Sequence, residues 1–186
     1  PVAKESLAVA LTEIGTRLKL CGNNQPGMDM YKQALCVAPS YAPAHYNMGM
    51  VEFEEGRYEA ALRHYRRAAE INPLYPEPYC NIGVVYKLQG ENRKAVEAYE
   101  KCLQIAPNFP IARNNIAIAL THLGTEAKAQ GRFGEALKLY QRALTYNPQH
   151  AEALYSLGVA HGEAGDLNQA LFFFEMCVNF VPACAE

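Results

Sequence analysis

Residues 76–109 read PEPYCNIGVVYKLQGENRKAVEAYEKCLQIAPNF, and the outline of this stretch recurs along the whole 186-residue chain. A glycine, Gly90, divides the stretch into two segments of helical length, and Pro107 lies near its end. The equivalent prolines are 34, 34, 41 and 34 residues apart: Pro39, Pro73, Pro107, Pro148 and Pro182. Self-similarity at this spacing is typical of a solenoid, in which each unit buries its apolar face against its neighbours.

Each unit places the same small and aromatic residues at fixed distances before its proline. A glycine lies 24 residues before it: Gly15, Gly49, Gly83, Gly124 and Gly158. An aromatic residue lies eight residues before the proline: Tyr31, Tyr65, Tyr99, Tyr140 and Phe174. Small residues let two antiparallel helices approach closely, and a glycine between the helices suits a left-handed helix end. This is the tetratricopeptide pattern, and it predicts an all-α, right-handed solenoid of five helix pairs.

The pattern also predicts where the units begin and end. The expected units are 1–41, 42–75, 76–109, 110–150 and 151–184, with 185–186 as the start of a truncated sixth. Units 1–41 and 110–150 each carry seven extra residues in the first helix. Seven residues add almost two turns, about 10 Å, and keep the apolar stripe on the same side of the helix. We expect the chain to be a piece of a longer protein.

The last expected helix is rich in apolar residues that no later unit of this chain covers. These residues are Phe172, Phe173, Phe174, Val178 and Phe180. A solenoid end normally needs a polar capping helix, so we expect this edge or its equivalent to self-associate.

Charge and cysteine usage narrow the partners and the compartment. Lysine and arginine number 17 against 19 aspartates and glutamates, the pI is near 6.3, and no block of like charges occurs. We therefore expect neither nucleic acid nor a membrane surface as a partner. None of the six cysteines forms a CxxC pair, and half occupy small or apolar positions of the repeat, as free thiols do in the cytoplasm or nucleus.

The sequence contains no recognisable catalytic constellation. The five histidines never form HxxxH or HExxH, so we expect no metal site. The glycines separate helices rather than cluster into a phosphate-binding loop, and no nucleophile is paired with a base. We expect no catalytic residue and no cofactor in this stretch of chain.

One row of polar residues stands out on the first helices, which in a solenoid of this kind line the inner surface. Asn47, Asn81 and Asn115 each occupy the sixth position of their unit, while Ser6 and Ser156 interrupt the row. An asparagine side chain can pair with both backbone groups of an extended peptide without reading its side chains. The row therefore predicts a peptide-binding track, with local stabilisation of the helix pairs as the alternative.

Further residues on these helices are candidates to line the same groove. They are Tyr46, Met50, Val84, Thr121 and His122. Apolar patches between polar side chains suit an unfolded peptide segment, although core packing explains some of them equally well. A clamp for a C-terminal carboxylate is disfavoured, because it needs converging basic residues and no first helix has two lysines or arginines four apart.

Five sequence stretches together resemble a known family. They are AVALTEIGTRLKLCGN, PYCNIGVVYKLQGE, CLQIAPNFPIARNN, IAIALTHLGTEAKAQG and YSLGVAHGE, in units of 41, 34, 34, 41 and 34 residues. In these features the chain is similar to the tetratricopeptide region of the SPINDLY family, the plant-type relatives of the O-linked N-acetylglucosamine transferases.

The resemblance carries several implications about the parent protein. It implies a nuclear and cytoplasmic glycosyltransferase that moves fucose from GDP-fucose to Ser/Thr hydroxyls, DELLA growth repressors included, and so restrains gibberellin signalling. The catalytic half would follow the repeats, so the sugar, fucose or N-acetylglucosamine, is decided outside this chain. The resemblance also implies that Asn47, Asn81 and Asn115 engage the substrate backbone, and that the repeats mediate dimerisation. The alternative is a non-enzymatic scaffold or assembly module.

Overall fold

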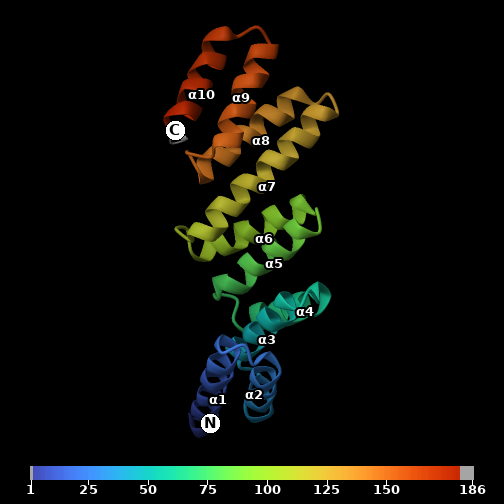
Figure 1. Ribbon diagram of the computed structural model, residues 1–186, viewed down its shortest axis with the longest axis vertical. Coiled ribbons are helices and arrows are strands. Elements are labelled where there is room, and N and C mark those ends of the chain that lie inside the picture. The colour runs from blue at the N-terminus through green and yellow to red at the C-terminus, as the bar shows by residue number, and fades with distance from the viewer. Residues whose placement is uncertain (1, 181–186) are drawn as a thin grey trace. The chain divides into compact units, whose positions relative to one another are not determined.

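The computed structural model describes residues 2–180, which form ten α-helices and no strand (Figure 1). The first helices of the five pairs are α1 (Val2–Leu20), α3 (Ala42–Glu54), α5 (Pro76–Leu88), α7 (Pro110–Ala129) and α9 (Ala151–Glu163). The second helices are α2 (Asn24–Val37), α4 (Tyr58–Ile71), α6 (Asn92–Ile105), α8 (Phe133–Tyr146) and α10 (Leu167–Phe180). The predicted all-α fold of helix pairs is confirmed.

Glycine and proline end the helices as their backbone preferences require. The glycine between the two helices of each pair has a φ of +74 to +82°, which a residue with a Cβ rarely adopts. At the other end of the pair, Asn72 precedes Pro73 and has left the helix, with φ −128° and ψ 91°. A proline disfavours the helical conformation of the residue before it, so α4 stops there.

Close packing within a pair depends on the glycine in the first helix. A Cβ built on Gly49 would lie 2.6 Å from the ring of Tyr65, whose side chain is fully buried. Gly124 meets Tyr140, and Gly158 meets Phe174, in the same way. The aromatic ring of the second helix therefore fills the space that a missing side chain leaves on the first.

The helix lengths confirm the predicted extensions. α3, α5 and α9 contain 13 residues each, whereas α7 contains 20 and the described part of α1 contains 19. The extra turns of α7 lie before Gly124, which still packs on Tyr140 of α8. A heptad lengthens the helix without rotating its apolar face away from its partner.

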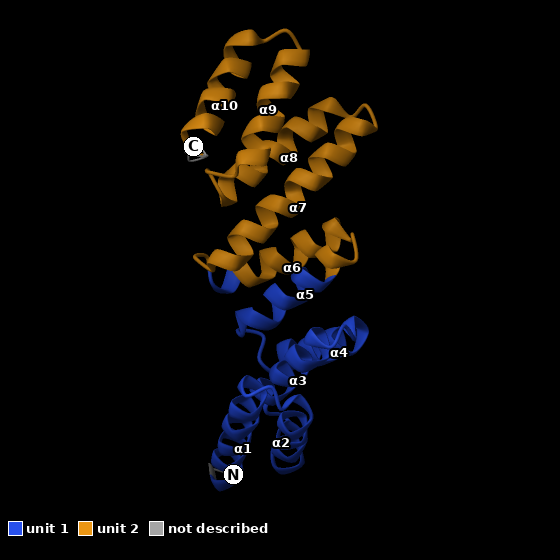
Figure 2. Cartoon of the chain, viewed as in Figure 1, with its two compact units in different colours: residues 1–85, 104–106 blue, residues 86–103, 107–186 orange. Residues whose placement is uncertain are grey.

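The chain divides into two compact units, coloured separately in Figure 2. The first comprises residues 1–85 and 104–106, and its core includes Met28, Tyr31, Met48 and Val51. The second comprises residues 86–103 and 107–186, and its core includes Ala127, Ala136, Tyr140 and Leu157. The helix α5 contributes to both units, with the division after Val85.

The outer side of α10 carries the apolar residues expected there. Phe172 is 52% exposed and Val178 is 73% exposed, whereas Phe173 and Phe174 are half-buried against α9. Self-association through this face stays a prediction, as do the unit boundaries, and positions 185–186 lie outside the described residues. None of the described helices combines the length and the hydropathy that a membrane span requires.

Candidate peptide-binding surface

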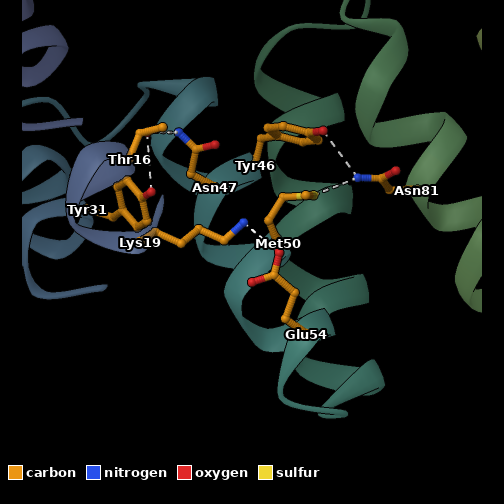
Figure 3. Close-up of polar contacts among 8 residues, drawn as sticks. All are labelled: Thr16, Lys19, Tyr31, Tyr46, Asn47, Met50, Glu54 and Asn81. Atoms are coloured by element: carbon orange, nitrogen blue, oxygen red, sulfur yellow. Dashed lines mark hydrogen bonds and ion pairs between the residues drawn. The ribbon is translucent and has the colours of Figure 1, made fainter. Parts of the chain in front are cut away.

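Two of the three predicted asparagines, Asn47 and Asn81, lie in the first unit and make equivalent contacts (Figure 3). Asn47 on α3 donates from Nδ2 to Oγ1 of Thr16 on α1, at 3.4 Å. Asn81 on α5 lies 3.1 Å from Sδ of Met50 on α3 through its own Nδ2. Both contacts reach back 31 residues, so each asparagine touches the residue that follows the packing glycine of the preceding first helix.

Both asparagines keep hydrogen-bonding capacity beyond these contacts. Each side chain is half-buried, and each uses its amide nitrogen toward the preceding helix. An asparagine offers two N–H donors and a carbonyl acceptor, so one amide proton of Asn47 and its oxygen remain for another partner. The predicted track and the predicted local role are therefore compatible at this position.

Aromatic side chains surround Asn81 in the first unit. Its Nδ2 donates to the hydroxyl of Tyr46 at 3.3 Å, and the ring of Tyr46 lies 5.3 Å from that of Tyr75 and 5.9 Å from that of Tyr65. Burial raises the pKa of Tyr65 and of Tyr75, and neighbouring Tyr46 raises both further, so these phenols stay protonated. Among the described residues, the buried hydroxyl of Tyr65 has no hydrogen-bond partner.

A pocket on the first unit includes Asn47. We call it the α1/α3 pocket; its volume is about 430 Å³, and it is lined by Val9, Thr12, Glu13, Thr16, Arg17, Tyr41 and Asn47. Thr12 is only 5% exposed, and its hydroxyl has no hydrogen-bond partner in the described structure. The equivalent hydroxyl of the other long helix, on Thr121, donates to the carbonyl of Ala117 at 2.9 Å. The unpaired hydroxyl of Thr12 thus belongs to a pocket.

The charged residues at this end of the first unit differ in their pairing. Lys19 on α1 and Glu54 on α3 form an ion pair of 2.6 Å across the two first helices (Figure 3). Glu13 and Arg17, by contrast, are exposed and enter no ion pair within the described part of the chain. Burial raises the pKa of Tyr41, and the carboxylates of Glu13 and Glu5 raise it further.

The third asparagine, Asn115, lies in the second unit and makes a different contact. Its Oδ1 accepts a hydrogen bond of 2.7 Å from Nζ of Lys87, which lies 28 residues earlier. Among the described residues, no acceptor forms a hydrogen bond with its amide nitrogen. Asn115 therefore presents donors where Asn47 presents both a donor and an acceptor.

The five candidate groove residues differ in accessibility. Tyr46, Met50 and Val84 are half-buried, and His122 on α7 is exposed. Thr121 is fully buried and its hydroxyl is bonded within its own helix, so its side chain offers no surface to a ligand. Thr121 lies three residues, about one helical turn, before the packing glycine Gly124, so it belongs to the buried face of α7.

Three features of this surface were not predicted from the sequence: Thr16, Lys87 and the α1/α3 pocket. Thr16 has a signal in the sequence, because a threonine follows the packing glycine in both long units, at Thr16 and Thr125. Each of these hydroxyls lies 3.3 Å from the hydroxyl of the tyrosine in the second helix, Tyr31 or Tyr140. The contact of Lys87 with Asn115 and the presence of the pocket depend on how successive helix pairs pack on each other. The sequence of a single repeat does not show this packing.

Two histidines in the first unit face each other. Nδ1 of His45 on α3 lies 3.5 Å from Nδ1 of His64 on α4. Burial lowers the pKa of both histidines, and the proximity of His64 lowers that of His45 further. Among the residues that the structure describes, no group of three or more histidine, cysteine, aspartate or glutamate side chains is arranged to hold a metal ion.

Three family models match the chain, and all describe the same repeat. A TPR repeat model matches residues 49–90, and tetratricopeptide repeat models match residues 76–109 and 108–183. Among solved structures, the chain is similar to YrrB, titled "a TPR protein with an unusual peptide-binding site", with a TM-score of 0.69, 20% identity, and coverage of 95% of this chain and 88% of that one. A crystal structure of MamA gives a TM-score of 0.66 at 18% identity, over 94% and 91%. These two structures show the fold.

Curated relatives share a shorter stretch at higher identity. A probable UDP-N-acetylglucosamine--peptide N-acetylglucosaminyltransferase SPINDLY from Hordeum vulgare is 48% identical over 60 residues, which are 32% of this chain and 6% of that protein. The protein of the same name from Arabidopsis thaliana is 48% identical over 61 residues, 33% of this chain and 7% of that protein. The match therefore spans a small part of the length of these relatives. The chain belongs to the tetratricopeptide-repeat family, as a protein-interaction module related to the repeat region of SPINDLY proteins.

Proposed function

We propose that the chain is the substrate-recruiting arm of a SPINDLY-like protein O-glycosyltransferase of the cytoplasm and nucleus. In this proposal the arm holds extended, Ser/Thr-containing segments of client proteins, of which DELLA-type growth repressors are one class. GDP-fucose is the donor that the resemblance implies, whereas the names of the relatives specify N-acetylglucosamine. Chemistry on the sugar belongs to a catalytic part of the parent protein.

The observation that carries the proposal is the equivalent placement of Asn47 and Asn81. Each is half-buried on a first helix, and each is held by a contact to the residue 31 positions earlier. A side chain fixed in this way loses little further conformational entropy on binding, which favours affinity. The free amide proton of Asn47 and the carbonyl oxygens of both asparagines can pair with the C=O and N–H groups of an extended backbone, whatever its side chains. The partner class that fits is therefore a disordered polypeptide.

The test is fluorescence anisotropy with labelled, disordered Ser/Thr-rich peptides. The triple variant Asn47→Ala, Asn81→Ala and Asn115→Ala should weaken binding by about a hundredfold or more, if each amide contributes about 1 kcal/mol. Ser156→Ala is the matched control, because the sixth position of that unit carries no amide. Thermal unfolding of each variant separates lost binding from lost stability, since Asn47 also bonds Thr16. Unchanged affinity in a folded triple variant contradicts the track.

A second candidate function is assembly, and the exposed apolar side chains of α10 favour it. Phe172 and Val178 are 52% and 73% exposed, so α10 presents large apolar side chains that a second copy could cover. A homodimer through this face would separate on Phe172→Glu. Sedimentation measurements distinguish the two functions. An assembly module should form a dimer and bind no peptide, whereas a recruiting arm should bind peptide without forming a dimer.

A further inference from the structure

We propose that the α1/α3 pocket is a side-chain site that accepts a basic residue, lysine or arginine, of a peptide lying along the first unit. This inference rests on the proposed function, because Asn47 belongs both to the asparagine row and to the pocket wall. A backbone held at Asn47 would present a neighbouring side chain to the pocket, since successive side chains of an extended chain are about 3.3 Å apart.

The pocket is built for a polar group rather than for an apolar one. Besides Val9, its lining residues all carry hydrogen-bonding atoms, and three of them are the hydroxyl residues Thr12, Thr16 and Tyr41. The hydroxyl of Thr12 is more than nine-tenths buried and unpartnered within the described structure, which is unfavourable for a hydrogen-bonding group. A ligand group or a water that bonds this hydroxyl would remove the cost.

The equivalent long helix shows that the unpaired hydroxyl is a property of this position. Thr121 of α7 occupies the same place in its unit as Thr12, yet its hydroxyl is bonded to the carbonyl of Ala117. The pocket-lining set contains Thr12 but no residue of α7. The same side chain is therefore bonded within its helix in α7 and unpaired in α1, where it lines the pocket.

The charges around the pocket select a basic partner. The carboxylates of Glu13 and Glu5 both act on the phenol of Tyr41, which favours its protonated form. Arg17 is the one cation in the pocket lining, and neither Arg17 nor Glu13 forms an ion pair with a described residue, so two carboxylates outnumber a single guanidinium near Tyr41. An ammonium or guanidinium group would donate hydrogen bonds to the carboxylate of Glu13 and to the hydroxyl oxygens of the lining, all of which can accept them.

The experiment compares two peptides that differ in a single charge. One is a disordered Ser/Thr-rich peptide with one lysine, and the other carries norleucine there, which keeps the aliphatic stem and removes the ammonium. The wild-type chain should bind the lysine peptide about fivefold more tightly, a value suited to a partly exposed ion pair. Glu13→Gln should reduce this preference to about twofold or less, whereas Glu175→Gln, which removes an exposed charge on α10, should preserve it.

The threonine pair supplies the matched structural control. Thr12→Val should lower the preference for lysine about twofold and leave the melting temperature unchanged or higher, because its hydroxyl has no partner in the free protein. Thr121→Val should leave the preference unchanged and lower the melting temperature, because it loses the bond to Ala117. Raising the salt concentration should also shrink the preference.

The outcomes separate this proposal from the peptide track. Equal binding of both peptides by the wild-type chain, with affinity still lost in the triple asparagine variant, overturns the pocket and keeps the track. A preference for lysine that survives both Glu13→Gln and Thr12→Val also overturns the pocket proposal. Tighter binding of a peptide with glutamate in place of the lysine overturns it too, because Arg17 would then be the residue that binds the peptide side chain. Affinity that no asparagine substitution changes refutes the track itself.

Discussion

The substitution Gly49→Ala tests the rule that joins the two helices of a pair. A Cβ at this position would lie 2.6 Å from both Cδ1 and Cε1 of Tyr65 and 3.3 Å from its Cγ. Carbon atoms prefer about 3.5–4.0 Å, so the overlap is about 1 Å and involves two ring atoms. Because Tyr65 is fully buried, its ring cannot swing away, and α3 and α4 must move apart.

The net effect is a balance of two opposing contributions. Overpacking of a core costs about 1–3 kcal/mol, whereas replacing a helical glycine with alanine gains about 0.5–1 kcal/mol. We expect a net loss of about 1–2 kcal/mol in the free energy of unfolding. For a chain of this size that is a fall of roughly 2–8 °C in melting temperature.

The assay is thermal and urea unfolding followed by circular dichroism, with Gly134→Ala as the control. Gly134 lies in α8, and a Cβ built there meets no other atom within 4 Å. Gly134→Ala should therefore stabilise the chain by about 0.5–1 kcal/mol. If Gly49→Ala stabilises the chain as much as Gly134→Ala does, the close approach of the helices does not require a glycine, and the reasoning is refuted.

Two further predictions concern titratable groups of the first unit. The folded-state pKa of His45 and of His64 lies below the unfolded value near 6.5. The neutral histidines therefore stabilise the fold at pH values above 6.5. This stability is lost as the pH falls from 6.5 toward the folded-state pKa values. The melting temperature should thus drop as the pH is lowered from 7.5 to below 6.5, and less steeply in His64→Gln; an equal slope would contradict the lowered pKa of His64. In the ion pair of Lys19 and Glu54, Lys19 is largely covered and Glu54 is 42% exposed. Glu54→Gln should therefore lower the free energy of unfolding by less than about 1 kcal/mol, and leave it unchanged in high salt. Urea unfolding at two salt concentrations measures this difference.

The sequence predicted the helix pairs because each feature that fixes them is local. A glycine that needs a positive φ, a proline that stops a helix, and a small residue opposite a tyrosine recur within one unit, so their spacing reveals them. The extension of α7 followed from the same count, since the seven extra residues lie before Gly124 and leave its spacing to Tyr140 unchanged. These features require no knowledge of how one unit stacks on the next.

The candidate site was less predictable because its contacts run between units. That Asn47 bonds Thr16, and that the hydroxyl of Thr12 is unpaired while that of Thr121 is bonded, depends on the facing helix rather than on local sequence. The prediction for Thr121 came from its position on a long helix, yet burial is decided by what packs over that position. A repeated residue thus has a predictable place in its helix and an unpredictable environment.

The heptad insertion changes the contact that the asparagine of the row makes. Asn47 and Asn81 lie two residues before their packing glycines, whereas Asn115 lies nine residues before Gly124, one heptad earlier on the same helix face. The first two reach back 31 residues to the position after a glycine, and Asn115 reaches back 28 to a lysine. Seven residues preserve the direction of a side chain but shift it about 10 Å along the helix. Asn115 therefore lies on the same face of α7 as the position two residues before Gly124, but it contacts Lys87 through its oxygen rather than through its amide nitrogen.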